Sequence, residues 1–504
     1  MKKNKILLLI GIVSIKVGLA QSYFNKTYPL SVSDSLNRTE NYNVAIEIQG
    51  EGFLTVCNSW NFSNNNVKLV FDKIDYMGNL ILQKMYGDSG DSFLPMDIHF
   101  LGDSSIGVLV DKSSYLTDTT FFYFMRVNEL GDTLSTAIYS SGKTKTQPRK
   151  FISTSDSGLA MVGWAGEDAS QHNSMFLIKT DINRNVEWTK EFGDTSRYNV
   201  ATSILQLSDG GYFITGWVSE GTTNTYKRDA KLFRLNSYGD ILWELTYGIA
   251  DLFDNIEQII KINDNNFAMI GTRCIGPNFN ENADMWFLLV DSSGSVLRNK
   301  HSGGRYLEEI NHFVKVNDKF YCAGIQSLVF SGYTRGYLQA TNLDGDSLWS
   351  KNYVFDSTGS FVDCIWNLST CSDGGFLLCG QASPGITGTQ DAWLVKVDSN
   401  GCADTACAMS VSVSDDFLVK ESTCLIYPNP SYGFSSLQIG EGFLNLETCV
   451  TIFDMNGRLI SRKFMIPDRR NLLTPLIIPE SGIYLVTVKS GSKEQVLKWI
   501  VMKQ

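Results

Sequence analysis

Residues 201–247 read ATSILQLSDGGYFITGWVSEGTTNTYKRDAKLFRLNSYGDILWELTY, a pattern of four short strands separated by turns. The first strand ends at the turn 208–211, where Asp and Gly supply the backbone freedom that a tight hairpin needs. Gly216 lies inside the second strand, and a small residue there lets a neighbouring strand approach closely. The fourth strand carries Trp243. The strands expected from this stretch are 201–207, 212–217, 229–236 and 241–247.

The turn between the third and fourth strands recurs seven times along the chain. Its last residue is usually Gly, and the successive intervals are 53, 53, 55, 55, 51 and 56 residues. These turns end at Gly78, Gly131, Arg184, Gly239, Gly294, Gly345 and Gly401. A near-constant period of this size, with four short strands in each unit, is typical of a β-propeller. We therefore predict an all-β chain with a seven-bladed β-propeller over residues 21–407.

Two features bear on how the blades pack and how the ring closes. Trp188, Trp243 and Trp349 take the same place in their fourth strands, which favours packing between blades over a role in binding a ligand. The last repeat lacks a fourth strand after Gly401, whereas residues 23–30 resemble a fourth strand with no blade before it. We expect the N-terminal strand to complete the seventh blade, because closure removes exposed sheet edges.

The long loops that follow the second strands are expected on one face of the propeller and the tight turns on the other. Variable loops on a rigid scaffold are where recognition usually occurs. Exposed aromatic rings among amides and hydroxyls suit sugar rings or a protein surface. The candidate ligand-binding residues on this long-loop face are Trp60, Tyr115, Tyr226, Phe279 and Tyr333. The alternative is that these side chains only pack against their own loops.

The N-terminus has the pattern of a secretory signal peptide. Three lysines precede an apolar run, residues 6–15, that is too short to span a bilayer as a helix. Small residues follow, so residues 1–20 are predicted to be removed. Disulfides are expected in an exported chain with 10 cysteines, and Cys402 and Cys407 form a candidate local pair. Cys424 and Cys449 are a second possible pair. Which cysteines form disulfides with each other cannot be deduced from the sequence.

Charge and composition argue against several partners. The net charge is −10, made up of −17 in residues 21–424, +3 in residues 425–504 and +4 in residues 1–20. A large acidic body repels phosphate backbones, so no nucleic-acid partner is expected. The chain has no CxxC pair and only four scattered His, so neither a metal site nor a cofactor is predicted.

Residues 425–504 follow a polar linker, 408–424, and have the pattern of a small β-sandwich. The set closely resembles the type A C-terminal sorting domain of the type IX secretion system. The residues that carry this resemblance are Tyr427, Pro428, Asn429, Pro430, Gly457, Gly482, Tyr484 and, in the basic tail, Lys503. The resemblance implies that outer-membrane type IX machinery recognises this domain. It also implies that the protein ends up on the cell surface or secreted.

No catalytic residue is assigned, because the chain has no GxSxG, HExxH or P-loop motif. The first hypothesis is a binding or adhesion module for a glycan or a protein. The second is a secreted polysaccharide hydrolase with a carboxylate pair at the propeller axis. A hydrolase needs a deep axial pocket holding acidic groups with separated pKa values, whereas a binder is expected to show a broad aromatic and amide surface. A structural surface component is the third hypothesis.

Overall fold

A computed structural model gives the fold of the chain, which divides into two compact units, residues 1–411 and 412–504. Each unit is described by itself. In the first unit the structure describes residues 23–28, 38–61, 66–87, 90–167, 172–219, 227–249, 252–274, 283–303, 307–327, 334–355, 362–383 and 390–404. In the second it describes residues 424–502 except 428–430, 432–433, 440–442, 444–445, 456, 468–472, 478–479 and 492. The predicted signal peptide lies outside the described residues.

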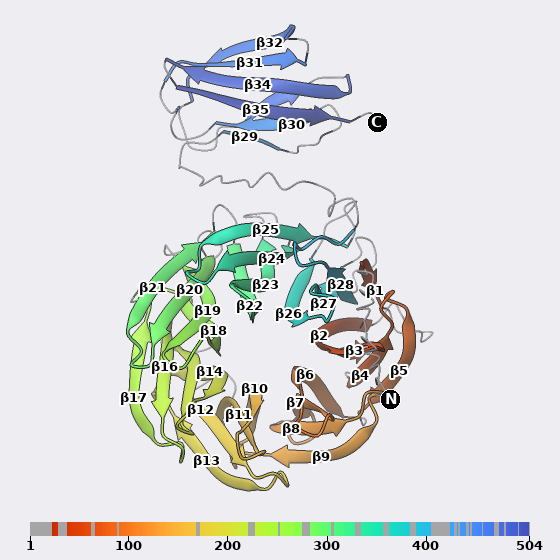
Figure 1. Cartoon of the computed structure of the whole chain (residues 1–504), viewed down its shortest axis with the longest axis vertical. Coiled ribbons are helices and arrows are strands. Elements are labelled where there is room, and N and C mark those ends of the chain that lie inside the picture. Colours follow the sequence, from red (N-terminus) through yellow and green to blue (C-terminus); the bar gives the residue numbers. More distant parts are fainter. Residues whose placement is uncertain are drawn as a thin grey trace, which may run out of the picture. The chain divides into compact units, whose positions relative to one another are not determined.

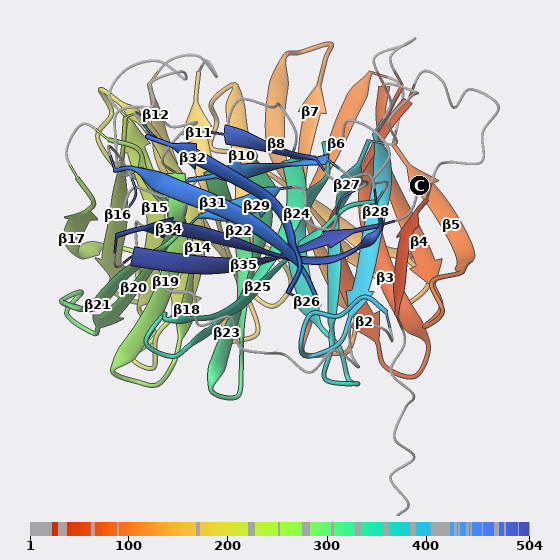
Figure 2. The ribbon, with the colours of Figure 1, turned by 90° about the horizontal axis from the view of Figure 1, so that it is seen from above.

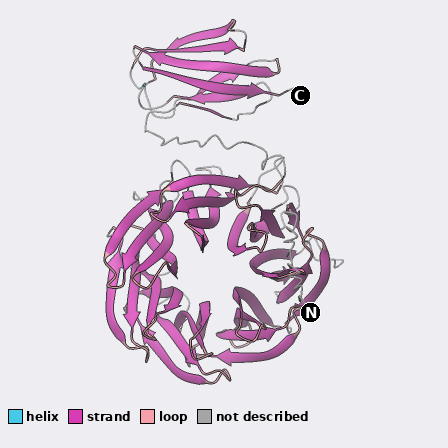
Figure 3. Cartoon of the chain, viewed as in Figure 1, coloured by secondary structure: helices cyan, strands magenta, loops and turns pink. Residues whose placement is uncertain are grey.

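The described part of the first unit is a ring of seven four-stranded antiparallel blades (Figure 1), as the sequence period predicts. None of the described residues forms an α-helix (Figure 3), so none forms a helix able to span a membrane. The innermost strands are β2 (Arg38–Ile48), β6 (Asp91–Phe100), β10 (Lys145–Ser153), β14 (Tyr198–Gln206), β18 (Asp254–Lys261), β22 (Leu307–Val316) and β26 (Cys364–Thr370). The second strands are β3 (Gly52–Asn61), β7 (Ile106–Ser114), β11 (Leu159–Gly166), β15 (Tyr212–Ser219), β19 (Asn266–Cys274), β23 (Lys319–Ser327) and β27 (Phe376–Ala382).

The outer half of each blade is equally regular. The third strands are β4 (Asn66–Ile74), β8 (Thr119–Val127), β12 (Asn173–Thr180), β16 (Arg228–Leu235), β20 (Ala283–Asp291), β24 (Thr334–Asn342) and β28 (Asp391–Val397). The fourth strands are β5 (Leu80–Tyr86), β9 (Thr133–Tyr139), β13 (Val186–Phe192), β17 (Ile241–Tyr247), β21 (Val296–Ser302), β25 (Ser347–Tyr353) and β1 (Phe24–Thr27). Seen from the side, the strands run along the ring axis and their connections gather at the two faces (Figure 2).

The N-terminal strand β1 is the outer strand of the seventh blade, in the order β1-β28-β27-β26. The pairing is antiparallel and places Phe24 opposite Lys396. The indole of Trp393 donates a hydrogen bond to Asn25 at 2.5 Å, and the amide of Tyr28 donates to the carbonyl of Ala392 at 2.9 Å. The two ends of the propeller are therefore joined by hydrogen bonds within one sheet.

At six of the seven blade junctions a repeated contact joins an aromatic ring to a turn glycine. At the seventh, the turn ends at Arg184, whose guanidinium carbon lies 5.8 Å from the ring centroid of Phe124. Gly78 has φ +74°, and a Cβ placed there would lie 2.7 Å from the ring of Phe24. The turn glycine therefore gives both the left-handed conformation and the space for the ring. Equivalent contacts pair Gly131 with Phe71, Gly239 with Trp188, Gly294 with Trp243, Gly345 with Phe287 and Gly401 with Trp349. The expected packing role of the fourth-strand Trp residues is confirmed.

A tyrosine at the end of the fourth strand adds a hydrogen bond to the same junction. The hydroxyl of Tyr353 donates to the carbonyl of Gly401 at 2.7 Å, and burial raises the pKa of this phenol, so it stays a donor. The same bond links Tyr28 to Gly78, Tyr86 to Gly131, Tyr139 to Arg184 and Tyr247 to Gly294. Phe192 stands at this place in the third blade and packs against Phe233 instead.

The second unit is a small β-sandwich of two antiparallel sheets. One sheet has the order β29 (Leu425–Tyr427), β30 (Phe434–Gln438), β33 (Leu473–Ile477). The other has the order β32 (Leu459–Met465), β31 (Thr448–Asp454), β34 (Gly482–Ser490), β35 (Lys493–Val501). Its core includes Leu437, Ile452, Val486 and the fully buried Trp499.

The cysteines differ in part from expectation. Cys424 and Cys449 do not form a disulfide with each other, so this possible pair is wrong. The two lie at different places in the sandwich: Cys424 is buried just before β29, and Cys449 sits in β31 beside Thr451. Cys407 lies outside the described residues, so the Cys402–Cys407 disulfide stays a prediction.

Gly78→Ala tests the contact that closes the ring. Both Gly78 and Gly374 have positive φ, +74° and +83°, but only Gly78 has a ring within reach of a new Cβ. Each substitution to Ala should cost about 1 kcal/mol through backbone strain. Gly78→Ala should cost about 1–3 kcal/mol more through overpacking against Phe24. Urea unfolding of the two variants measures the difference, and equal losses would contradict the packing role of this glycine.

Candidate functional site

Every innermost strand carries one β-bulge, always at the same level of its blade. In each pairing with the second strand the register skips one residue, for example between Ile256 and Gln258 in β18. A bulge leaves the extra residue out of the ladder and re-aims its side chain. The seven extra residues are Asn43, Met96, Arg149, Thr202, Glu257, Asn311 and Trp366.

A glycine in the second strand makes room for the bulge. A Cβ at Gly216 would lie 2.1 Å from the carbonyl oxygen of Val200, and one at Gly380 would lie 1.8 Å from that of Cys364. The same holds for Gly163, Gly271 and Gly324. The sequence predicts that a neighbouring strand approaches Gly216 closely. The structure shows that this neighbour is the innermost strand, at the position of its bulge. This glycine is the signal that would have pointed to the axial residues, which the sequence analysis did not single out.

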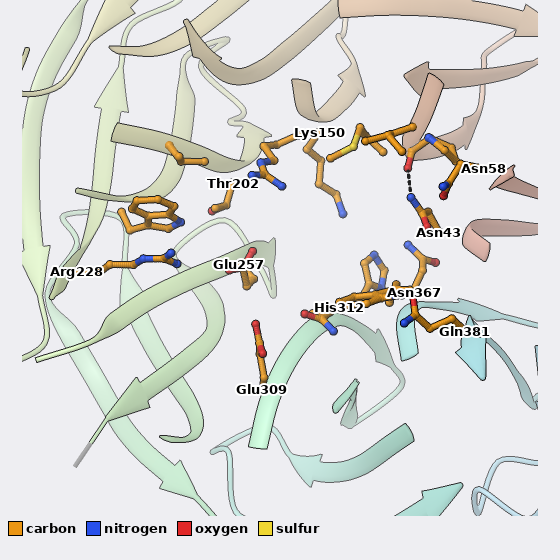
Figure 4. A pocket seen from close by; sticks show the side chains of 18 residues that line it. Asn43, Asn58, Lys150, Thr202, Arg228, Glu257, Glu309, His312, Asn367 and Gln381 are labelled. Carbon is orange, nitrogen blue, oxygen red and sulfur yellow. Dashed lines mark hydrogen bonds between the residues drawn. The ribbon is translucent and has the colours of Figure 1, made fainter. Parts of the chain in front are cut away.

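The seven bulge residues all line one axial pocket with a volume of about 520 Å³ (Figure 4). Its residues come from the innermost strands, the ends of the second strands and, for Arg228, the start of the third strand β16, so the pocket lies toward the long-loop face. The remaining lining residues are Asn58, Leu94, Pro95, Lys150, Val200, Trp217, Arg228, Glu309, His312, Asn367 and Gln381. No single blade forms this pocket, because all seven contribute to it.

Three bulge side chains join neighbouring blades around the pocket. Asn43 donates a hydrogen bond to the carbonyl of Pro95 at 2.9 Å. Thr202 donates to the carbonyl of Ile256, and Asn311 donates to that of Ile365 at 2.9 Å. Each acceptor is the residue just before the next bulge. The other four bulge side chains make no such bond to the next blade among the described residues, which leaves Met96, Arg149, Glu257 and Trp366 to face the cavity.

Two carboxylates lie in the pocket on the side from which Arg228 enters (Figure 4). Burial raises the pKa of Glu257, Arg149 opposes this shift, and nearby Glu309 adds to it. Burial also raises the pKa of Glu309, against the attraction of Arg228. Asn255 donates a hydrogen bond to Glu257 at 2.6 Å and orients it. The axial pocket that a hydrolase requires is present, but the pKa values of its two glutamates shift in the same direction.

A second axial cavity of about 610 Å³ lies toward the tight-turn face and shares His312 and Asn367 with the axial pocket. Burial lowers the pKa of His312 well below its usual value, so this imidazole is neutral at pH 7. Asp97 lines the second cavity and accepts hydrogen bonds from His99 at 3.0 Å and from the amide of Phe151 at 3.1 Å. Asp97 thus joins the second and third blades next to the axis.

Asp97 should make the stability of the propeller sensitive to acid. Burial alone would raise the pKa of Asp97, but His99 and Lys150 outweigh it and lower the pKa to about 2. Its stabilising contribution is therefore complete above about pH 4 and is lost as the pH falls to about 2. Asp97→Asn should cost about 2 kcal/mol at pH 7, and the difference from the unsubstituted chain should vanish near pH 2.

Unfolding midpoints in urea between pH 7 and pH 2 measure this dependence. Asp118→Asn is the control, because the Asp118 side chain is 87% exposed. A constant difference between Asp97→Asn and the unsubstituted chain across this range would contradict the role of the ionised carboxylate.

Of the residues predicted to bind a ligand, the two that the structure describes, Trp60 and Tyr115, do not line the axial pocket. Trp60 lies near the end of β3 and is 38% exposed, and Tyr115 follows β7 and is 50% exposed. Tyr226, Phe279 and Tyr333 lie outside the described residues. Binding by any of the five stays a prediction.

The sorting-motif residues are placed in the sandwich as follows. Gly457 closes the β31–β32 turn with φ +79°, and its amide donates to the carbonyl of Asp454 at 3.0 Å. Gly482 begins β34, and Tyr484 in the same strand is buried against Trp499, with 6.0 Å between ring centroids. Tyr427 ends β29. Pro428, Asn429, Pro430 and Lys503 lie outside the described residues.

The last strand of the chain is tied to the start of this domain through Ser431. The indole of Trp499 donates to the hydroxyl of Ser431 at 2.9 Å. The amide of Ser431 donates to the carbonyl of Ile500 at 2.9 Å, and the amide of Met502 donates back to Ser431 at 2.7 Å. Ser431 directly follows the Tyr-Pro-Asn-Pro motif. These hydrogen bonds therefore fix the position of Ser431 and of the last strand relative to each other.

Comparison with known proteins identifies the class of the second unit. Residues 425–502 match the family described as the secretion system C-terminal sorting domain. The protein is therefore an exported β-propeller protein that carries a type IX sorting domain and reaches the cell surface or the medium. No curated protein matches the chain.

Three solved structures illustrate the matches found by comparison of folds. An acylaminoacyl peptidase from Pyrococcus horikoshii is 12% identical, with a TM-score of 0.39 over 79% of this chain and 58% of the peptidase. The chain thus spans less than two thirds of that enzyme. The β-propeller domain of the Trilobed protease from Pyrococcus furiosus is 10% identical, with a TM-score of 0.41 over 71% and 94% of the two chains. An α-L-arabinanase from Penicillium chrysogenum complexed with arabinobiose is 11% identical, with a TM-score of 0.38 over 76% and 98%.

Trp499→Ala should prevent export by unfolding the sorting domain. The side chain is fully buried and holds both Tyr484 and Ser431, so its loss should cost about 3–5 kcal/mol. Val496→Ala in the same strand is the control, because Val496 is 55% exposed. Immunoblots of cell-surface and culture fractions measure export. Normal export of Trp499→Ala would show that the machinery does not need the packed sandwich.

Proposed function

We propose that the propeller is the binding module of this exported protein and that it takes a sugar-type ligand in the axial pocket. Sorting by the C-terminal domain delivers the module to the cell surface or the medium, where glycans are abundant potential ligands. The proposal keeps the binding function expected from the sequence. It moves the site from the loops to the propeller axis.

The composition of the pocket wall is the observation that carries this proposal. Five side-chain amides, Asn43, Asn58, Asn311, Asn367 and Gln381, line it together with the indoles of Trp217 and Trp366. Amides both donate and accept hydrogen bonds, as sugar hydroxyls do. The Trp366 indole offers a flat apolar face with a polar edge, whereas Trp217 already stacks on Arg228 and Tyr198. A volume of about 520 Å³ is in the range of small-molecule sites.

Trp366→Ala should weaken glycan binding by about 30-fold. Trp366 is the bulge residue of the seventh blade and is half-buried at the cavity, and truncating an aromatic anchor typically costs about 2 kcal/mol. The measurement uses the purified chain with a panel of polysaccharides and follows both depletion of the protein and release of soluble products. The double variant Trp60→Ala/Tyr115→Ala removes two exposed aromatic side chains outside the pocket and should bind normally.

The opposite pattern would contradict the site. If the double variant loses binding and Trp366→Ala keeps it, the ligand is bound by the loops. If no glycan depletes the protein, the sugar assignment fails, and a protein ligand or a structural role gains support.

A polysaccharide hydrolase is the second candidate, favoured by the presence of Glu257 and Glu309 in the same pocket. Glycoside hydrolysis needs a carboxylic acid and a carboxylate on either side of the scissile bond. Soluble product in the panel would support this candidate. Loss of that product in both Glu257→Gln and Glu309→Gln, with binding retained, would assign the reaction to the pair.

A further inference from the structure

Arg228 is held in the axial pocket by aromatic stacking. Its guanidinium carbon lies 3.9 Å from the ring centroid of Trp217 and 4.7 Å from that of Phe253. Trp217 in turn stacks on Tyr198, with centroids 5.5 Å apart and an angle of 22° between the rings. Stacking restricts a long side chain without using any of the guanidinium hydrogen-bond donors. Arg228 is therefore held in place by ring contacts, which leave its guanidinium donors available.

No protein group in the described part of the chain occupies those donors. The Arg228 guanidinium makes no hydrogen bond or salt bridge to any described residue, although it lines the pocket beside Glu257 and Glu309 (Figure 4). Arg149 lines the same pocket and likewise has no salt-bridge partner among the described residues. Lys150 is 3.9 Å from Asp97. Three basic side chains thus face two acidic ones in a propeller that is otherwise strongly acidic.

We propose that the axial pocket recognises a carboxylate-bearing sugar, a uronic acid unit of a polysaccharide, through the guanidinium groups of Arg228 and Arg149. This inference rests on the proposed glycan-binding function and names the class of glycan. A guanidinium forms two parallel hydrogen bonds with a carboxylate, and the fork of Arg228 is already oriented for it. The amides and glutamates that surround it then face the sugar hydroxyls.

The two glutamates select for a ligand of low charge. In their ionised forms Glu257 and Glu309 repel any anion that enters, and the repulsion grows with the charge of the ligand. A phosphate monoester carries close to two charges at pH 7, whereas a carboxylate carries one. The arrangement therefore favours a carboxylated sugar over a phosphorylated one.

Four sugars that differ only at C6 test this assignment: glucuronate, glucose, glucose 6-sulfate and glucose 6-phosphate. Calorimetric titration of the full chain at pH 7 should give the tightest binding for glucuronate. Arg228→Gln should weaken glucuronate binding about 10- to 100-fold and change glucose binding little, because hydrogen bonds between charged groups contribute about 1.5–3 kcal/mol. Arg228→Lys keeps the charge but loses the fork and should weaken binding almost as much.

Arg298→Gln is the matched control, because Arg298 is 53% exposed on β21 and outside the pocket. It removes the same charge and should leave glucuronate binding unchanged. Thermal unfolding of each variant shows whether the fold is kept.

Three results would overturn the uronic acid assignment. The first is tighter binding of the phosphate or sulfate ester than of glucuronate. The second is equal binding of glucose and glucuronate. The third is an equal loss of glucuronate affinity in Arg228→Gln and Arg298→Gln. If Trp366→Ala still abolishes glycan binding in these cases, the proposed function stands and only the ligand class is wrong. If Trp366→Ala has no effect either, both proposals fail.

Discussion

Closure of the ring is the constraint on which the rest of the propeller depends. Strand β1 precedes all the other described strands but completes the sheet of the last blade. The ring of Phe24 packs against Gly78, and the hydroxyl of Tyr28, just after the strand, donates to the Gly78 carbonyl, which are the two kinds of contact found at other junctions. Each blade buries its apolar faces against two neighbours. A gap at any junction would expose two sheets at once. The axial pocket exists only because this circuit is complete, since all seven blades supply its wall.

The axis shows how a repeated backbone can hold a unique site. Seven equivalent bulges turn one residue of each innermost strand toward the same cavity. The backbone is nearly the same in every blade, but the side chain at the bulge differs from blade to blade. Thr202 and Asn311 join blades, whereas Arg149, Glu257 and Trp366 offer a cation, a carboxylate and an indole to the cavity. Stacking of Arg228 on Trp217 adds a fixed guanidinium from a third strand.

The blades were predictable because their junctions use the same residues each time. A turn glycine and an aromatic ring recur with the blade period, and Phe24–Thr27, inside the expected strand 23–30, is the strand that the last repeat lacks. The axial site was not predictable in the same way. The residues at its bulges occupy the same position in each blade but differ in chemical type. No sequence motif therefore identifies them.

The glycine opposite the bulge is the one recurring sequence feature near the axis, and it is replaced by Cys57 and Val110 in the first two blades. The candidate ligand-binding residues share expected exposure and aromatic character, and these features locate loops but do not locate a cavity. Residues 425–502 were easier to assign, because Tyr427, Gly457, Gly482 and Tyr484 occur in a fixed order.

A crystal structure of the full chain soaked with glucuronate tests the central claim most directly. The account predicts the sugar at the propeller axis, with its ring against Trp366 and its carboxylate on Arg228. Sugar bound at Trp60 and Tyr115, or an axial pocket that stays empty while the protein binds glucuronate in solution, would contradict it.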